Sequence, residues 1–370
     1  MINLANMINQ INLMPNNKEK AIKTCLLYSY LNFYHDSKQI SNEDIQNIVN
    51  NINEIEVFGK HYFPNEQKSV NCLLNSTHKL NNMYESILTY ANNYNLFTIV
   101  PNTPVSIKKL FSYAKDFMNY IDPSMLDLLY KLIDMDLVYE CELTDFGGKC
   151  FKLDGDKSAI VIKYNTLPLV KIFTIVHEMG HAYFHYLGKD NPSLIRTNLA
   201  NESMPRIMEQ LFLEYLKDNH LIDKNTIDIY ERFFTMHQLY IANSVYIINK
   251  LLLCDIVDAD FHIENIKTRL KFDDFYNLSI IKPKDDTTQI YLAYINNYYA
   301  YAYLLSNVIR ERFKKDELET RKFLKELPIL ARELDANELI DLFDKEEYIN
   351  ATNKNTARVL SKTYYKRIKK

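Results

Sequence analysis

The sequence predicts a mainly α-helical protein with a small β-sheet next to one motif-bearing helix. Glycine and proline number only 6 and 10 among 370 residues, and such a shortage of turn-forming residues favours helices. The hydrophobic share of 47% and the charged share of 25% are ordinary for a globular protein. Because the chain is long for one core, we expect an N-terminal helical region, residues 1–140, and a second region, residues 141–370, either as packed lobes or as one continuous fold.

Two helices are predicted before the second region. Asp122 and Pro123 have the character of an N-cap and a first helical residue, and Leu126 and Leu129 then recur at helical spacing. Residues 107–120 show the same periodicity. Helices are therefore predicted on both sides of residue 122.

The β-sheet is predicted between residues 141 and 165. Residues 149–153 are followed by Asp154-Gly155-Asp156, which is typical of a hairpin turn. Residues 158–164 then form a cluster of β-branched and aromatic residues, which favours a strand. From residue 169 the pattern is helical to residue 187, and Gly188 is a plausible C-cap.

This last helix contains the motif HEMGH at residues 177–181. Residues four apart lie on one helical face, so His177 and His181 can hold one metal ion between them. Glu178 lies beside the first ligand, where a carboxylate can act as general base toward a water molecule. The apolar turn that precedes the motif indicates a buried helix rather than a surface helix with two ordinary histidines.

A catalytic zinc site needs a third protein ligand. His185 continues the four-residue series, but three ligands spread over two turns span ~12 Å of helix axis, so a polar or supporting role is favoured for it. Glu202 and Glu209 are seven residues apart and share a helical face. We expect Glu202 to bind the metal and Glu209 to orient a histidine ring. The alternatives are an ion pair between Glu202 and Arg206 and a solvated helix face for Glu209 or Glu214.

Charge and cysteine content exclude some other classes. A net charge of −3 argues against a nucleic-acid-binding protein. Five scattered cysteines without a CxxC pair make a disulfide framework improbable. The N-terminus lacks the pattern of a signal peptide, and no apolar stretch is long enough to cross a bilayer. We therefore expect a cytoplasmic protein without a membrane partner.

The motif and its flanks resemble the thimet oligopeptidase and oligoendopeptidase F family of zinc peptidases, the M3 family. The resemblance runs through residues 147–151, 160–165 and 173–181 and extends to about residue 310. In that family the third ligand is a glutamate followed by a proline and, seven residues on, by a second glutamate. Glu202, Pro205 and Glu209 match this arrangement.

The resemblance also implies a tyrosine-rich segment that hydrogen-bonds the reacting carbonyl. Residues 298–306 match it, with Tyr303 in the principal position and Tyr299 next, although a tyrosine stripe in a chain with 28 tyrosines can also be helix core. Two family histidines are missing: Phe184 replaces one, and residues 287–297 contain none. Tyr291 or Tyr294 is a candidate replacement.

From this resemblance we expect a cytoplasmic zinc endopeptidase with one Zn²⁺ per chain that hydrolyses short unfolded peptides. The predicted strand at residues 158–164 is expected to be an edge strand that pairs with a peptide backbone, through a segment comprising Ile160, Ile162, Tyr164 and Asn165. A dedicated processing peptidase for a leader or bacteriocin-type precursor, and a non-catalytic peptide-binding relic of the fold, are the alternatives.

Overall fold

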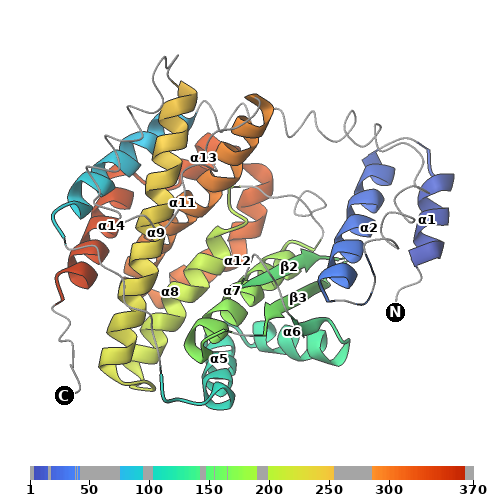
Figure 1. Ribbon diagram of the computed structural model, residues 1–370, viewed down its shortest axis with the longest axis horizontal. Coiled ribbons are helices and arrows are strands. Elements are labelled where there is room, and N and C mark those ends of the chain that lie inside the picture. Colours follow the sequence, from blue (N-terminus) through green and yellow to red (C-terminus); the bar gives the residue numbers. More distant parts are fainter. Residues whose placement is uncertain are drawn as a thin grey trace.

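The computed structural model confirms the predicted class, a mainly helical protein with one small sheet (Figure 1). The residues it describes are 4–15, 18–37, 39, 41, 76–94, 103–141, 147–153, 155–164, 166–189, 199–253 and 286–362. Within these ranges no helix has the length and apolar character that a membrane span requires.

The elements follow one another along the chain with the sheet near the middle. The helices before the sheet are α1 (Leu4–Leu13), α2 (Lys18–Asp36), an unlabelled helix at 76–91, α5 (Ile107–Ile121) and α6 (Pro123–Asp134). The strands are β1 (Val138–Cys141), β2 (Gly148–Lys152) and β3 (Ser158–Lys163). The later helices are α7 (Pro168–Leu187), α8 (Ser203–Asp218), α9 (Lys224–Leu253), α11 (Asp286–Lys315), α12 (Glu317–Glu333), α13 (Ala336–Ile340) and α14 (Lys345–Leu360).

The three strands are arranged in the order β1-β3-β2. β3 pairs in parallel with β1 and antiparallel with β2, and the β2–β3 turn contains Gly155 with a φ of 62°, a conformation that favours glycine. The expectation that residues 158–164 form an edge strand is therefore wrong. β3 is the central strand, and its continuous apolar run reflects burial between two neighbours rather than an open edge.

Helices α7 and α2 pack on the sheet, and the alternation along β2 shows which side chains face each of them. A Cβ on Gly148 would touch Thr174 and Glu178 of α7, so Gly148, Cys150 and Lys152 face α7. Lys149 binds Asp36 of α2 at 2.7 Å, and Phe151 contacts Phe33 of α2. β2 thus contacts α2 with one face and covers α7 with the other.

The larger part of the molecule is a set of long helices around α8 and α11 (Figure 1). One hydrophobic core extends from Tyr30 in α2 to Leu360 in α14. Within it, the Asn249 side-chain amide of α9 donates to Asn81 at 2.9 Å and to Asn297 of α11 at 3.1 Å. These hydrogen bonds between buried side-chain amides link the three helices.

Asp122 caps α6 as predicted and also joins three helices. Its Oδ1 accepts a bond of 2.9 Å from the backbone N–H of Ser124. Its Oδ2 accepts a bond of 2.7 Å from the Tyr183 hydroxyl of α7 and lies 2.6 Å from Lys325 Nζ of α12. Burial alone would raise the pKa of this carboxyl, but Lys325, Tyr183 and Ser124 outweigh it and lower the pKa to about 2.

Replacing Asp122 tests this connection. Asp122→Ala should lower the free energy of unfolding by ~1–2 kcal/mol at pH 7, because the cap and its two partners are lost. Asp122→Asn keeps the cap and loses only the charge. Since the folded pKa lies below the unfolded value of ~3.9, the advantage of wild type over Asp122→Asn should be full above about pH 4 and vanish as the pH falls through about 2. Urea unfolding from pH 7 to 2 measures both differences, and a pH-independent difference would contradict the charged link.

Candidate metal centre

Helix α7 holds the motif residues in a buried position. Gly188 is its C-cap, as the sequence predicts, and the helix begins at Pro168, one residue before the expected start. Phe173, one turn before His177, stacks on Tyr230 of α9 with ring centroids 4.0 Å apart. This packing fixes the rotation of α7, so that the rings of His177 and His181 lie together with centroids 5.0 Å apart.

Helix α8 brings a carboxylate to the two imidazoles. Glu202, the N-cap residue of α8, lies 3.5 Å from Nε2 of His177 through one oxygen and 3.5 Å from Nε2 of His181 through the other. One ligand atom from each of the three side chains lies within 4.8 Å of the others, so the group can hold a metal ion. Glu202 Oε2 is buried without a hydrogen-bond partner, as expected for an oxygen whose partner is a cation. Two imidazoles and one carboxylate are ligands that zinc accepts.

The distance between α7 and α8 depends on Gly180. A Cβ at this position would lie 2.6 Å from the Cα and 3.0 Å from the N of Pro205. Contacts this short do not occur, so only glycine permits the two helices to approach so closely. Gly180 lies between His177 and His181 in α7, and Pro205 lies three residues after Glu202. The contact between them therefore controls how near Glu202 comes to the two histidines.

Glu178 lies beneath the sheet, with only 4% of its surface exposed. A Cβ on Gly148 would be 2.9 Å from Glu178 Oε1, so the bare backbone of β2 leaves room for this carboxylate. Burial raises the pKa of Glu178, and Glu202 and Glu209 add to the rise while His177 and His181 oppose it. A carboxyl group with a raised pKa is better suited to accept and return a proton near neutral pH.

Glu209 lies behind the first histidine. Its Oε2 is 3.5 Å from Nδ1 of His177 and 2.7 Å from Nη1 of Arg206. This is the place where a carboxylate fixes the ring orientation of a metal-binding histidine. Burial would lower the pKa of His177, but Glu209 and Glu202 outweigh Arg206 and burial and raise it. The carboxylates around His177 thus favour a cation at this point.

His185 and Glu214 lie outside this group. His185 is buried one turn beyond His181, where its Nδ1 is 3.0 Å from Ser158 Oγ of β3, and burial lowers its pKa well below the usual value. Glu214 lies 3.2 Å from Lys217 and 2.7 Å from Lys314. These partners tie Glu214 to the far end of α8 and to α11, away from the histidines.

Two tyrosines of α11 were candidates for the carbonyl-binding group, and the structure brings only the first to the cluster. Glu202 and burial raise the pKa of Tyr299, and its hydroxyl interacts with the Glu202 carboxylate. The Tyr303 hydroxyl instead faces Asn307, Asn355 and Thr356 in the core between α11 and α14. The two positions are one helical turn apart, and only the earlier turn of α11 is level with the start of α8.

The expected peptide-binding segment is not an open surface. Ile160 and Ile162 are each 1% exposed, and they lie opposite Cys150 and Gly148 on the face of the sheet that packs against α7. Tyr164 is 61% exposed, with Lys171 over its ring. Asn165 lies outside the described residues, as do the side chains of Tyr291 and Tyr294.

Two residues near the cluster were not singled out in the sequence as site residues. Arg206 lies between Glu202 and Glu209 on α8, and the sequence offered it only as an ion-pair partner of Glu202. His237 of α9 is three residues after Phe234, whose ring lies 5.8 Å from the Arg206 guanidinium. His237 is partly exposed to solvent. Burial of the rest of the side chain and the nearby charge of Arg206 lower its pKa to about 4. Only the packing of α9 on α8 reveals His237, because no motif includes it.

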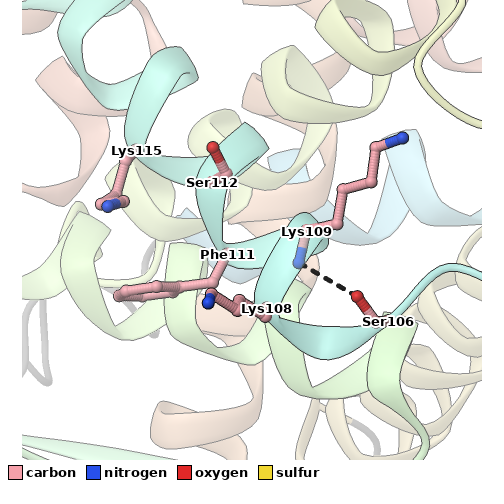
Figure 2. Close-up of a pocket in the computed structure, with 6 residues that line it drawn as sticks. All are labelled: Ser106, Lys108, Lys109, Phe111, Ser112 and Lys115. Atoms are coloured by element: carbon pink, nitrogen blue, oxygen red, sulfur yellow. Dashed lines mark hydrogen bonds between the residues drawn. The ribbon is translucent and has the colours of Figure 1, made fainter.

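A separate pocket of about 500 Å³ lies at the start of α5 (Figure 2). Its described lining consists of Ser106, Lys108, Lys109, Phe111, Ser112 and Lys115. Ser106 caps the helix by accepting a bond of 3.4 Å from the Lys109 N–H, and Lys115 lies over the Phe111 ring. The described lining holds no metal-binding side chain, so this pocket is distinct from the cluster.

Solved peptidase structures are similar to this chain in fold. A structure titled as an oligoendopeptidase F matches with a TM-score of 0.53 and 14% identity, over 71% of this chain and 50% of that one. An oligoendopeptidase F from Bacillus anthracis matches with a TM-score of 0.54 and 13% identity, over 97% of this chain and 69% of that one. PZ peptidase A, solved with an inhibitor, matches with a TM-score of 0.58 and 12% identity, over 97% of this chain and 71% of that one.

The chain has an oligoendopeptidase-like fold. It spans half the length of the first of these structures and about seven tenths of the other two. No protein-family model and no curated protein sequence matches it. The predicted resemblance is therefore confirmed at the level of the fold.

Substitution of Gly180 tests the role of the α7–α8 contact. Gly180→Ala should lower the stability by ~1–3 kcal/mol, because backbone rather than a flexible side chain must move. It should also weaken zinc binding by at least ~10-fold, since Glu202 moves away with α8. Chelator competition and thermal unfolding measure these effects. Gly147→Ala is the control, because its Cβ would meet Thr174 at an ordinary 3.4 Å. Equal zinc affinity in both variants would contradict the argument.

Proposed function

We propose that this protein is a zinc-dependent endopeptidase that hydrolyses short unfolded peptides. The observation that carries the proposal is the grouping of His177, His181 and Glu202 around one point, with Glu178 beside it under β2. The fold shared with the oligoendopeptidase structures supports the same reading. That the peptides are short and unfolded is what the resemblance to the M3 family implies.

Each residue of the cluster has a separate task in this proposal. His177, His181 and Glu202 hold the ion, and Glu209 keeps the His177 ring in place. A bound zinc ion supplies Lewis acidity to the peptide carbonyl and to water. Glu178 takes a proton from the attacking water and returns it to the leaving amine. Its raised pKa keeps both transfers accessible near neutral pH.

We assign peptide recognition to β2 instead of β3. Among the described residues β2 has only β3 as a neighbour, so its other edge is available for main-chain hydrogen bonds. Gly148 of this strand lies directly over Glu178. A peptide that extends β2 therefore passes the general base with its backbone held in register.

We assign the carbonyl-binding hydroxyl to Tyr299. Its neighbours Glu202 and Glu178 raise its pKa, so the phenol stays protonated and can donate. A donor at the carbonyl oxygen contributes most when negative charge develops there. This assignment replaces Tyr303, whose hydroxyl faces α14.

The central test separates metal binding from proton transfer. Glu178→Gln should keep about one zinc per chain and a native unfolding curve, yet lose at least ~100-fold in turnover of a mixed peptide library, because an amide cannot accept the proton. Glu202→Ala should lose zinc as well as turnover. Metal analysis of the purified variants and mass spectrometry of the digests measure both properties.

A chelator provides the control for that experiment, since it should abolish cleavage by the wild type and addition of zinc should restore it. Near-normal turnover by Glu178→Gln would refute the general-base role. Zinc binding without any peptide cleavage by the wild type would instead favour a non-catalytic peptide-binding protein.

The tyrosine assignment predicts a difference between two matched variants. Tyr299→Phe should lower kcat ~100-fold or more with little change in KM, because the lost hydroxyl acts mainly in the transition state. Tyr303→Phe keeps the same ring in the core and should change kcat less than twofold, with little change in stability, because the Tyr303 hydroxyl is buried without a hydrogen-bond partner among the described residues. The reverse order of effects would return the role to Tyr303.

A further inference from the structure

Arg206 is a buried cation in the wall of the metal cluster. It lies on α8, one turn after Glu202, and its side chain is only 12% exposed. One end of the guanidinium binds Glu209, with Nη1 at 2.7 Å from Oε2, and Nε is buried without a hydrogen-bond partner. Burial acts to lower the pKa of Arg206, but Glu209 and Glu202 outweigh it, so the group is charged.

Arg206 reaches the first histidine through a single oxygen atom. The Glu209 Oε2 that Arg206 binds is also the oxygen 3.5 Å from Nδ1 of His177. The guanidinium and the imidazole therefore share one carboxylate oxygen. Any change in the charge of Arg206 alters how strongly Glu209 acts on His177 and on whatever His177 holds.

The ring of Phe234 on α9 fixes the guanidinium from the other side, at 5.8 Å from its centroid. Phe234 is 6% exposed, so this contact excludes water as well as restricting movement. A planar guanidinium can lie against a ring while it binds a carboxylate at its edge. The position is thus built for an arginine, with support from α8 and α9 together.

A divalent cation and Arg206 together balance the three carboxylates of the cluster. Lys152, the buried cation on the α7 side of β2, donates instead to Gly155 in the β2–β3 turn. Glu178, Glu202 and Glu209 are 4%, 6% and 6% exposed and together contribute three negative charges when ionised. Tyr299 and His237 add no charge, since a phenol and an imidazole are ordinarily neutral at pH 7.5. A divalent cation supplies two positive charges and Arg206 supplies the third. Without Arg206 the buried cluster would keep one unbalanced negative charge, which is costly in a water-poor site.

We infer that Arg206 is a positioning residue that offsets the third carboxylate, so that the cluster is electrically neutral when it holds a divalent cation. This inference rests on the proposed metal site. Removal of the Arg206 charge should therefore strengthen zinc binding and lower turnover. The surplus negative charge attracts a divalent ion more strongly. It also opposes the negative charge that develops on the substrate carbonyl during hydrolysis.

Zinc dissociation constants of the full-length protein, measured by competition with a chromophoric chelator at pH 7.5, test the inference without relying on activity. Arg206→Met should bind zinc ~10-fold more tightly than wild type, while kcat for peptide cleavage falls at least ~10-fold. Glu209→Gln should bind zinc ~10-fold more weakly. The double variant Arg206→Met/Glu209→Gln removes one charge of each sign, and its affinity should return to within about threefold of wild type.

Two further variants decide between charge and structure. Arg206→Lys retains the charge and should lie closer to wild type than Arg206→Met in zinc affinity. Arg312→Met removes an arginine paired with Glu347 on the surface, away from the cluster, and should leave the affinity unchanged. A purely structural role predicts weaker zinc binding for Arg206→Met and the weakest for the double variant, and either result overturns the inference. Absence of zinc binding by the wild type would instead overturn the proposed function.

Discussion

A side chain at position 180 has no room, because its Cβ would lie 2.6 Å from the Cα of Pro205. This approach of α7 to α8 determines the rest of the site. It places the start of α8 level with the two histidines and directs Glu202 between their Nε2 atoms. Two turns on, it brings Glu209 beside His177, with Arg206 bound to the same carboxylate. The aromatic packing of Phe173 against Phe212 and Tyr230 supports the contact from the core.

The surroundings of the cluster explain why its charges act strongly on one another. Carboxylates in a water-poor interior interact over longer distances than carboxylates on a surface. The sheet covers Glu178 from one side. Gly148 of β2 has no side chain that would collide with the Glu178 carboxylate. Helices α9 and α11 contribute neutral polar groups, His237 and Tyr299, at the side that solvent reaches. The buried charges of the cluster thus lie next to a side chain that solvent reaches.

Local sequence patterns predicted the parts of the site that depend on one helix. The four-residue spacing of His177 and His181 and the capped ends of α6 and α7 are properties of contiguous segments. The central position of β3 was missed, because an apolar run is compatible with an edge or a central strand until its neighbours are known. Tyr299 and Tyr303 share one face of α11, and only the packing of α11 on α8 distinguishes them. The four-residue spacing of Glu202 and Arg206 is compatible with an ion pair, whereas the guanidinium of Arg206 donates its hydrogen bond to Glu209.

The positions of these residues along the chain separate two parts of the site. His177, His181, Glu202 and Glu209 belong to two consecutive helices, so the metal-binding group closes a short loop of chain. Tyr299 comes from α11, about a hundred residues later, and its approach closes a much longer loop. Contacts between near neighbours in sequence generally form sooner during folding. We therefore expect the α7–α8 pair to acquire the ability to hold a cation before the tyrosine reaches it, so that metal uptake can stabilise an incomplete chain before any peptide can be cut.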